Sequence, residues 1–113
     1  MATNYAQYIQ DGAEIDYTPA ADTPAGTVVQ QGNLIGVTKK FIDENQLGAI
    51  AVEGVFAFPK STAAGSGMAV GITVYWDPVN NVATATAGTN VMIGKVVGAA
   101  ADADTTVQVR LHQ

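Results

Sequence analysis

Turn signals divide this chain into short segments and constrain its fold more than any other feature. Gly and Asn-containing turns recur roughly every ten residues, and short runs rich in Val, Ile, Thr, Tyr and Phe lie between them. A helix would need apolar residues three and four positions apart over ten or more residues, and such periodicity is nearly absent. The chain is therefore predicted to be all-β, with about eight short strands in one small barrel or sandwich.

The strand positions follow from alternation and from the turns. Residues 107–111 alternate Val, Gln, Val, Arg and Leu, which places one face of a strand in a core and the other in solvent. Gln31-Gly32-Asn33 reads as a tight hairpin turn, whereas residues 39–46 and 61–71 are predicted as loops, the second flexible. Strands are predicted at residues 14–18, 27–30, 34–38, 47–52, 55–58, 72–77, 82–86, 90–100 and 105–111.

The core is expected to be thin. Apolar residues make up 48% of the 113 residues, but many are Ala and Val, and only three Phe and one Trp offer large side chains. A lone Trp within a strand is usually a core anchor rather than a stacking platform for a ligand. The residues predicted to be buried are Trp76, Phe56, Phe58, Val74, Ile93 and Val109.

Charge argues against nucleic acid as a partner. The net charge is -5, whereas nucleic-acid affinity comes largely from Lys and Arg that neutralise phosphates. Lys39 and Lys40 are the only adjacent pair of lysines and are interpreted as a solvated turn. The chain contains no cysteine, no apolar run long enough to span a membrane and no leader-like start, so we expect it to remain in the cytoplasm until assembly.

No catalytic motif is complete. Residues 88–95, GTNVMIGK, approach a phosphate-binding loop, but they have one residue too many between the glycines and Val96 where Ser or Thr belongs. The single imidazole, His112, and the serines Ser61 and Ser66 lie in positions that turn chemistry explains. The chain is therefore predicted not to be an enzyme and to need no cofactor or small-molecule substrate.

Carboxylates offer only a weak metal hypothesis. Asp102 and Asp104 are close in sequence and could ligate calcium weakly, but a turn or a solvated face explains them more simply. The same applies to Asp43 and Glu44 in the 39–46 loop. No metal site is therefore predicted.

The first 12 residues are interpreted as a flexible arm, followed by a single β-domain over residues 13–113. The arm is polar apart from Tyr5, Tyr8 and Ile9, and no Gly turn would fold it back onto the domain. Ordering such a segment costs backbone entropy that a neighbouring protein surface would have to offset. Tyr5, Tyr8 and Ile9 are accordingly predicted to contact a partner.

Several segments in order resemble one family. They are residues 1–38, then GAIAVEGVFAFPK, VYWD, IGKVVGAA and TVQVRL, and AVEGVFAFPK and VYWD are the most specific. Together they resemble the phage and prophage capsid cement, or head decoration, proteins, some of which carry the label of predicted phage recombinase. The resemblance implies a homotrimeric subunit on the outer surface of the virion that bridges major capsid proteins, with a β-clip or β-tulip fold as in lambda-type head decoration proteins.

Two alternatives remain open from the sequence. The recombinase label suggests a DNA-recombination accessory protein, although the acidic charge and the lack of a basic stripe argue against it. The Gly-turned segment AGTVVQQGNLIGV also resembles hairpins of small ligand-binding β-clip modules. A salt-dependent gel shift would indicate the first alternative, and a deep polar pocket would be required for the second.

Overall fold

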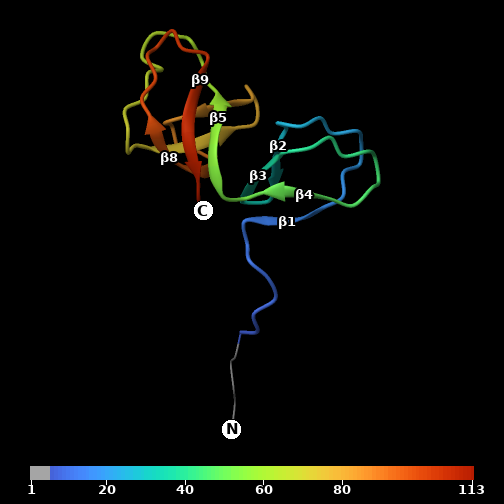
Figure 1. Ribbon diagram of the computed structural model, residues 1–113. Coiled ribbons are helices and arrows are strands. Elements are labelled where there is room, and N and C mark those ends of the chain that lie inside the picture. Colours follow the sequence, from blue (N-terminus) through green and yellow to red (C-terminus); the bar gives the residue numbers. More distant parts are fainter. Residues whose placement is uncertain (1–5) are drawn as a thin grey trace.

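The computed structural model describes residues 6–113, and all of its regular elements are β-strands (Figure 1). The all-β prediction is confirmed. No helix among these residues is long and apolar enough to cross a membrane. The strands are β1 (Glu14–Tyr17), β2 (Val28–Gln31), β3 (Leu34–Thr38), β4 (Gly48–Ala51), β5 (Gly54–Pro59), β6 (Thr73–Asp77), β7 (Val82–Thr84), β8 (Val91–Gly98) and β9 (Thr106–Leu111).

Strand boundaries agree with the sequence pattern to within about two residues, the usual scatter of such assignments. β3 begins and ends where alternation and the flanking turn place it. The turn before β3 consists of Gly32 and Asn33, and of these two only Gly32 adopts a positive φ, 60°. The strand predicted at residues 82–86 is shorter in the structure, where β7 ends at Thr84. Thr86 lies beyond the strand and donates its backbone N–H to Thr84 Oγ1.

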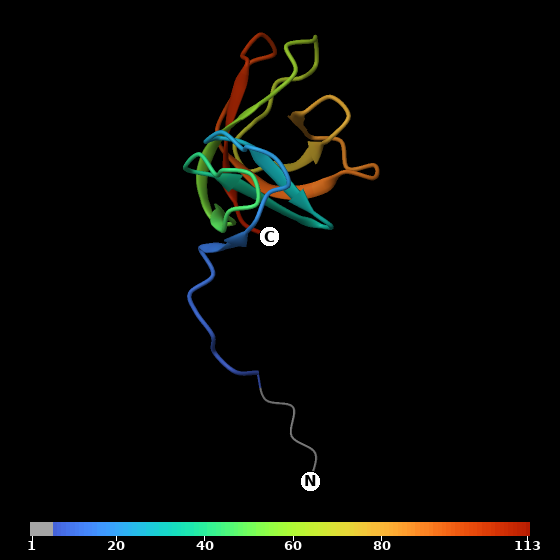
Figure 2. The same cartoon turned by 90° about the vertical axis from the view of Figure 1, so that its right-hand side faces the viewer.

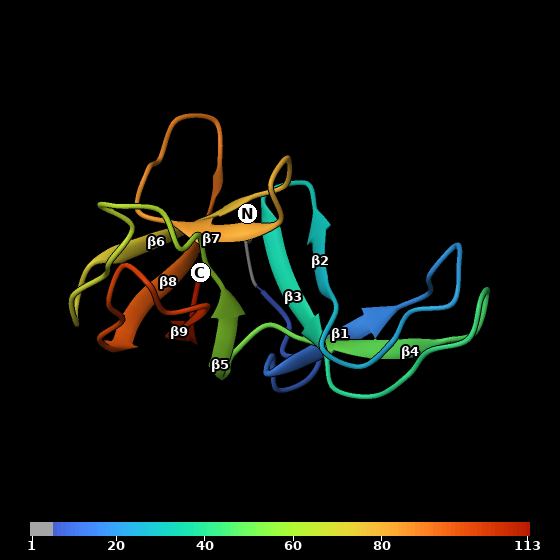
Figure 3. The same cartoon turned by 90° about the horizontal axis from the view of Figure 1, so that it is seen from above.

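The nine strands form two antiparallel sheets that lie side by side (Figure 3). The four-stranded sheet has the order β1-β4-β3-β2, and the five-stranded sheet has the order β5-β9-β8-β6-β7. The five-stranded sheet curls until its two edges meet at one parallel bridge between Lys60 and Ala83. It is therefore an almost closed barrel, to which the smaller sheet is attached.

The main core lies inside the curled sheet and between the two sheets. Trp76 is 5% exposed, and its ring centroid lies 6.2 Å from that of the fully buried Phe58. Five of the six predicted core residues are buried; the exception is Phe56, which is only partly buried because it packs against the cluster from its rim. The cluster comprises Ile35, Val37, Phe58, Met68, Val74, Trp76, Ala83, Ile93, Val96, Val107, Val109 and Leu111.

Gln113 joins the two sheets through its side chain. Its Oε1 accepts the backbone N–H of Ile35 at 2.7 Å, and its Nε2 donates to the Ile35 carbonyl, also at 2.7 Å. β4 pairs with β3 only at Val37 and Thr38, so the Gln113 amide takes the place of a strand residue beside Ile35. Buried backbone groups need such partners, and no buried side-chain nitrogen or oxygen among residues 6–113 lacks one.

Candidate functional site

Residues 6–13 extend away from both sheets (Figures 1 and 2). The side chains of Tyr8 and Ile9 are each 77% exposed, which is unusual for large apolar residues. Val52 N donates a hydrogen bond to the Ala13 carbonyl at 2.9 Å, which attaches the end of this segment to the chain just after β4. Tyr5, the third residue predicted to contact a partner, lies outside the described residues.

The hydrogen bonds of the arm are local. The Tyr8 hydroxyl donates to Asp11 Oδ1 at 2.8 Å, and this bond raises the pKa of Tyr8 because it stabilises the protonated phenol beside a carboxylate. Gln10 Nε2 lies 3.4 Å from the Glu14 carbonyl oxygen. These contacts set the local shape of the arm and leave the side chains of Tyr8 and Ile9 exposed.

A buried lysine holds together the two long loops at the other end of the barrel. Lys60 is only 4% exposed, and its ammonium donates to carbonyls on both loops. The acceptors are the carbonyl oxygens of Ser61 at 2.7 Å, Ala101 at 2.9 Å, Asp102 at 3.0 Å and Asp104 at 3.0 Å. We call this arrangement the Lys60 cage; a buried charge is tolerated there because oxygen dipoles surround it.

Asp102 adds a second connection between the same loops. Its Oδ2 accepts the N–H of Gly65 at 3.1 Å and its Oδ1 accepts the N–H of Gly67 at 2.6 Å. These backbone bonds, led by that from Gly65, lower the pKa of Asp102, and the Lys60 charge lowers it further. Residues 61–71 do form a loop, as predicted, but hydrogen bonds donated by Lys60 and accepted by Asp102 hold its first half in place.

The same bonds explain why the Asp102/Asp104 pair is not arranged as a metal site. Asp104 Oδ2 accepts the N–H of Ala101 at 2.8 Å, while Asp102 is engaged by two glycine amides. Calcium requires six to eight oxygen ligands, several of them usually carboxylates. No group of three or more His, Cys, Asp or Glu side chains within residues 6–113 is placed to hold an ion.

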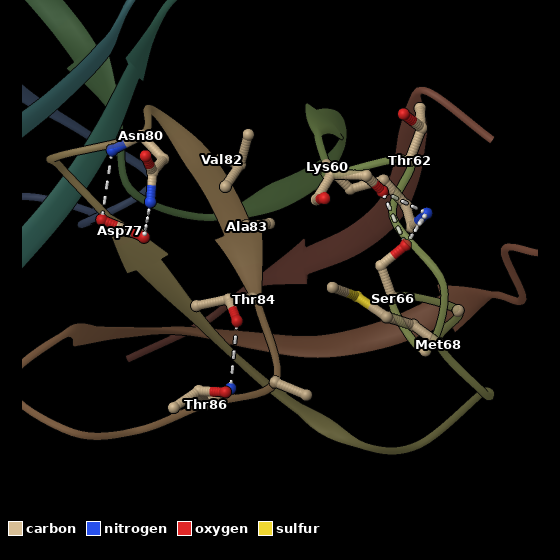
Figure 4. Close-up of a pocket in the computed structure, with 14 residues that line it drawn as sticks. Lys60, Thr62, Ser66, Met68, Asp77, Asn80, Val82, Ala83, Thr84 and Thr86 are labelled. Atoms are coloured by element: carbon tan, nitrogen blue, oxygen red, sulfur yellow. Dashed lines mark hydrogen bonds between the residues drawn. The ribbon is translucent and has the colours of Figure 1, made fainter. Parts of the chain in front are cut away.

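A polar groove of about 690 Å³ lies beside the Lys60 cage, between the 61–71 loop and the β6–β7 hairpin. Figure 4 shows Lys60 and Ser66 on one side of it and Asp77, Asn80 and Thr84 on the other. At the hairpin, Asp77 accepts hydrogen bonds from the side chain and backbone of Asn80, which lower the pKa of Asp77. The groove is thus walled by groups whose hydrogen bonds are made within the protein.

Ser66 and Lys60 superficially resemble a nucleophile and its base, since Lys60 Nζ lies 3.3 Å from Ser66 Oγ. A base must turn a free lone pair toward the hydroxyl, whereas Lys60 Nζ is directed at carbonyl oxygens of both loops as a hydrogen-bond donor. Ser66 Oγ in turn lies 2.8 Å from the Ser61 carbonyl, to which it can donate. The pair holds the loop together and is not arranged for nucleophilic attack.

The remaining sequence candidates lie apart from one another. His112 is exposed beyond β9 and donates its backbone N–H to Ile93 at 3.1 Å, far along the chain from either serine. Most of the GTNVMIGK segment lies in β8, where backbone amides pair with β6 and β9 instead of facing a phosphate. Trp76 is a core residue, as the sequence predicted.

Comparison with known proteins identifies the family. The family profile of phage cement proteins matches residues 9–111, a range that begins in the arm and includes all nine strands. The chain belongs to the phage cement protein family. Cement proteins are structural components of phage capsids, which gives this chain a structural role in association with capsid proteins. No curated protein and no solved structure matches.

Membership in the cement family agrees with the features described above, which are an exposed arm and hydrogen-bonded loops. The arm was visible in the sequence as a polar segment with isolated large side chains. The Lys60 cage was missed, because its carbonyl acceptors at residues 101–104 lie far along the chain and any residue type can supply a carbonyl. The one available sign was a Lys directly after an apolar strand and before a Gly-rich and Ala-rich loop.

Proposed function

We propose that this cement protein decorates the outer surface of an icosahedral phage or prophage head as a homotrimer and bridges neighbouring major capsid protein subunits. In this proposal residues 1–12 are the contact arm and residues 13–113 are the folded β-domain. Tyr5, Tyr8 and Ile9 are the contact residues on the arm. The observation that supports it is the exposure of the two apolar side chains of the described arm, Tyr8 and Ile9.

The energetics of the arm favour binding to a shell. Fixing each backbone residue costs about 1–2 kcal/mol, and burying a Tyr or Ile side chain returns a similar amount. An extended segment can also add its backbone hydrogen bonds to the edge of a partner's sheet. One arm therefore binds weakly, whereas several arms on one trimer bind together, because each later contact is made at high effective concentration.

The composition of the body suits a protein that is covered by neighbours. Only 13% of residues are charged, and exposed apolar side chains such as Val55 and Leu47 remain on the surface. A surface with few charges and some exposed apolar side chains suits burial against neighbouring proteins. Nucleic acid is not among the proposed partners, since the net charge is -5 and one of the five cationic side chains, Lys60, is buried.

The experiment compares the stability of heads with and without the arm. Heads assembled from the major capsid protein of the same phage are melted alone, with full-length protein and with protein lacking residues 2–12. Full-length protein should raise the melting temperature of the heads, because a ligand that binds only the intact shell stabilises it by mass action. The truncated protein should keep its β-structure by circular dichroism and protect the heads poorly.

Point variants test whether the apolar side chains of the arm, and not only its backbone, contribute to head binding. Tyr8→Ala with Ile9→Ala should reduce head binding, while Val70→Ala with Val79→Ala, which also removes two exposed apolar side chains, should leave it unchanged. Equal protection by the truncated and full-length proteins would show that the folded domain makes the contact. Failure of the full-length protein to bind heads at all would refute the proposed function.

A further inference from the structure

The solvent face of β5, β9 and β8 carries cationic and apolar side chains side by side. Val55, Arg110 and Lys95 lie directly opposite one another across the three strands, so their side chains share one face. Lys95 Nζ also donates to Thr73 Oγ1 on β6 at 2.8 Å, which holds its charge on this face. Val97 is 43% exposed on the same strand as Lys95. We call this surface the basic face.

The basic face contains no acidic residue. None of β5, β8 or β9 includes an Asp or a Glu, although the protein has ten of them. A mainly apolar groove of about 330 Å³ crosses the face, between the cations and the exposed side chain of Met92. A surface that is positive, apolar and grooved in an acidic protein fits a partner that presents carboxylates around an apolar side chain.

The same chain presents such a surface at the opposite end. The connection between β3 and β4 exposes Phe41 and Leu47, with side chains 55% and 72% exposed, beside Asp43 and Glu44. Seven of the ten acidic residues, but only two of the five basic ones, precede residue 54. We call residues 41–47 the acidic loop; Lys39 and Lys40 are the two cations near it.

The two surfaces cannot meet within one molecule. The acidic loop lies at one end of the body, and β8 lies at the other (Figures 1 and 3). A contact between them must therefore join two copies, head to tail. Heterologous contacts of this kind close into a ring when the rotation permits, and otherwise continue as an open chain.

We propose that the basic face of one copy binds the acidic loop of a second copy, and that this contact closes the trimer. The inference rests on the proposed homotrimer and names the surfaces that would form it. Leu47 and Phe41 would cover the groove beside Val97, and Asp43 and Glu44 would face Lys95 and Arg110. The arms would then remain free to bind the shell.

Crosslinking tests the contact on the protein as it exists, because the chain has no native cysteine to interfere. The double variant Leu47→Cys and Val97→Cys is treated with a short thiol-specific crosslinker, both free and bound to heads. Covalent dimers and trimers should form. The matched variant Val70→Cys and Val97→Cys should give neither, because Val70 is 63% exposed, against 72% for Leu47, but lies outside both surfaces.

Charge reversal tests the chemistry of the contact. Lys95→Glu with Arg110→Glu should weaken self-association by at least about tenfold, and so should Asp43→Lys with Glu44→Lys. A variant that carries all four substitutions should recover much of it, because the two surfaces then exchange charges and every contact of the ring is again complementary. Association is measured by light scattering over a range of salt concentrations, and on heads by the yield of crosslinked trimer.

The outcomes separate this inference from the proposed function. Trimers that form but respond to neither charge reversal, or that do not crosslink through residues 47 and 97, would overturn the contact and leave the homotrimer standing. A protein that remains monomeric both free and on heads would overturn the contact and the homotrimer together. Head binding by that monomer would still support the decorating role.

Discussion

Replacing Lys60 with Met would test whether the Lys60 cage is a principal source of stability. Met matches the four-atom apolar stem of Lys, but it lacks the ammonium and donates no hydrogen bond. Carbonyls on both loops would lose their donor, at about 1–3 kcal/mol for each one that water cannot reach, while the cost of burying the ammonium would also disappear. The net loss should resemble that of breaking a buried charge interaction, about 3–5 kcal/mol.

Such a loss is a large share of the roughly 5–15 kcal/mol by which a domain of this kind is stable. The melting temperature of Lys60→Met should therefore fall by about 10–25 °C. Unfolding can be followed by the fluorescence of Trp76, the only tryptophan, which lies buried in the barrel. Chemical denaturation on the same samples gives the free energy of unfolding directly.

Lys39→Met is the matched control, because Lys39 is an exposed lysine that follows β3 and lies outside the Lys60 cage. Its free energy of unfolding should change by no more than about 0.5 kcal/mol. Hydrogen exchange in Lys60→Met should rise in residues 61–71 and 99–105, which the cage joins. If the two variants unfold at the same denaturant concentration, the reasoning about the cage is wrong.

Three further changes have expected outcomes. Trp76→Ala should cost about 3–5 kcal/mol of folding free energy, because the ring packs on Phe58 and leaves a cavity; thermal denaturation by circular dichroism measures it. Gly94→Ala should prevent folding or lower the melting temperature steeply, since its Cβ would overlap the backbone carbonyl of Arg110 on β9. The pKa of Asp102 is lowered in the folded protein, so its ionised carboxylate stabilises the fold at any pH above the ordinary Asp pKa. This stabilisation is lost as the pH falls through the lowered pKa of Asp102. Proteolysis of the 61–71 loop should therefore increase only in acid, below about pH 4.

Each change has a control. Trp76→Phe keeps much of the packed volume and should lose less stability than Trp76→Ala. Gly12→Ala introduces a methyl group into open space and should leave the melting temperature unchanged. Asp102→Asn should remove the acid dependence of loop proteolysis. An unchanged melting temperature for Trp76→Ala or Gly94→Ala, or an acid response that survives in Asp102→Asn, would contradict the corresponding argument.

The strands were predictable because they rest on local rules. Alternation places Val107, Val109 and Leu111 on one face of β9, and all three are buried. The turn at Gly32 fixes the hairpin of β2 and β3, since a two-residue turn requires a positive φ that Gly accepts without strain. These features depend on residues within a few positions of one another, which is the range over which a sequence pattern is informative.

The parts that the sequence missed depend on distant residues and on backbone atoms. Lys60 finds its acceptors beyond residue 100, and Gln113 pairs with Ile35, which lies 78 positions earlier. Neither partner carries a distinctive side chain, so no motif marks the contact. The partial exposure of Phe56 could not be predicted either. Alternation along β5 directs its side chain toward the core, but only the packed structure shows that neighbouring residues leave it partly exposed.

The position of β9 in the five-stranded sheet has a consequence for how the chain folds. β9 lies between β5 and β8, so β5 has no strand partner within its sheet until residues 106–111 have been synthesised. Pairings between strands so distant in sequence fold slowly, and an apolar strand with open edges can meanwhile pair with other chains. Until β9 is inserted, β5 therefore leaves each newly made chain open to pairing with other chains.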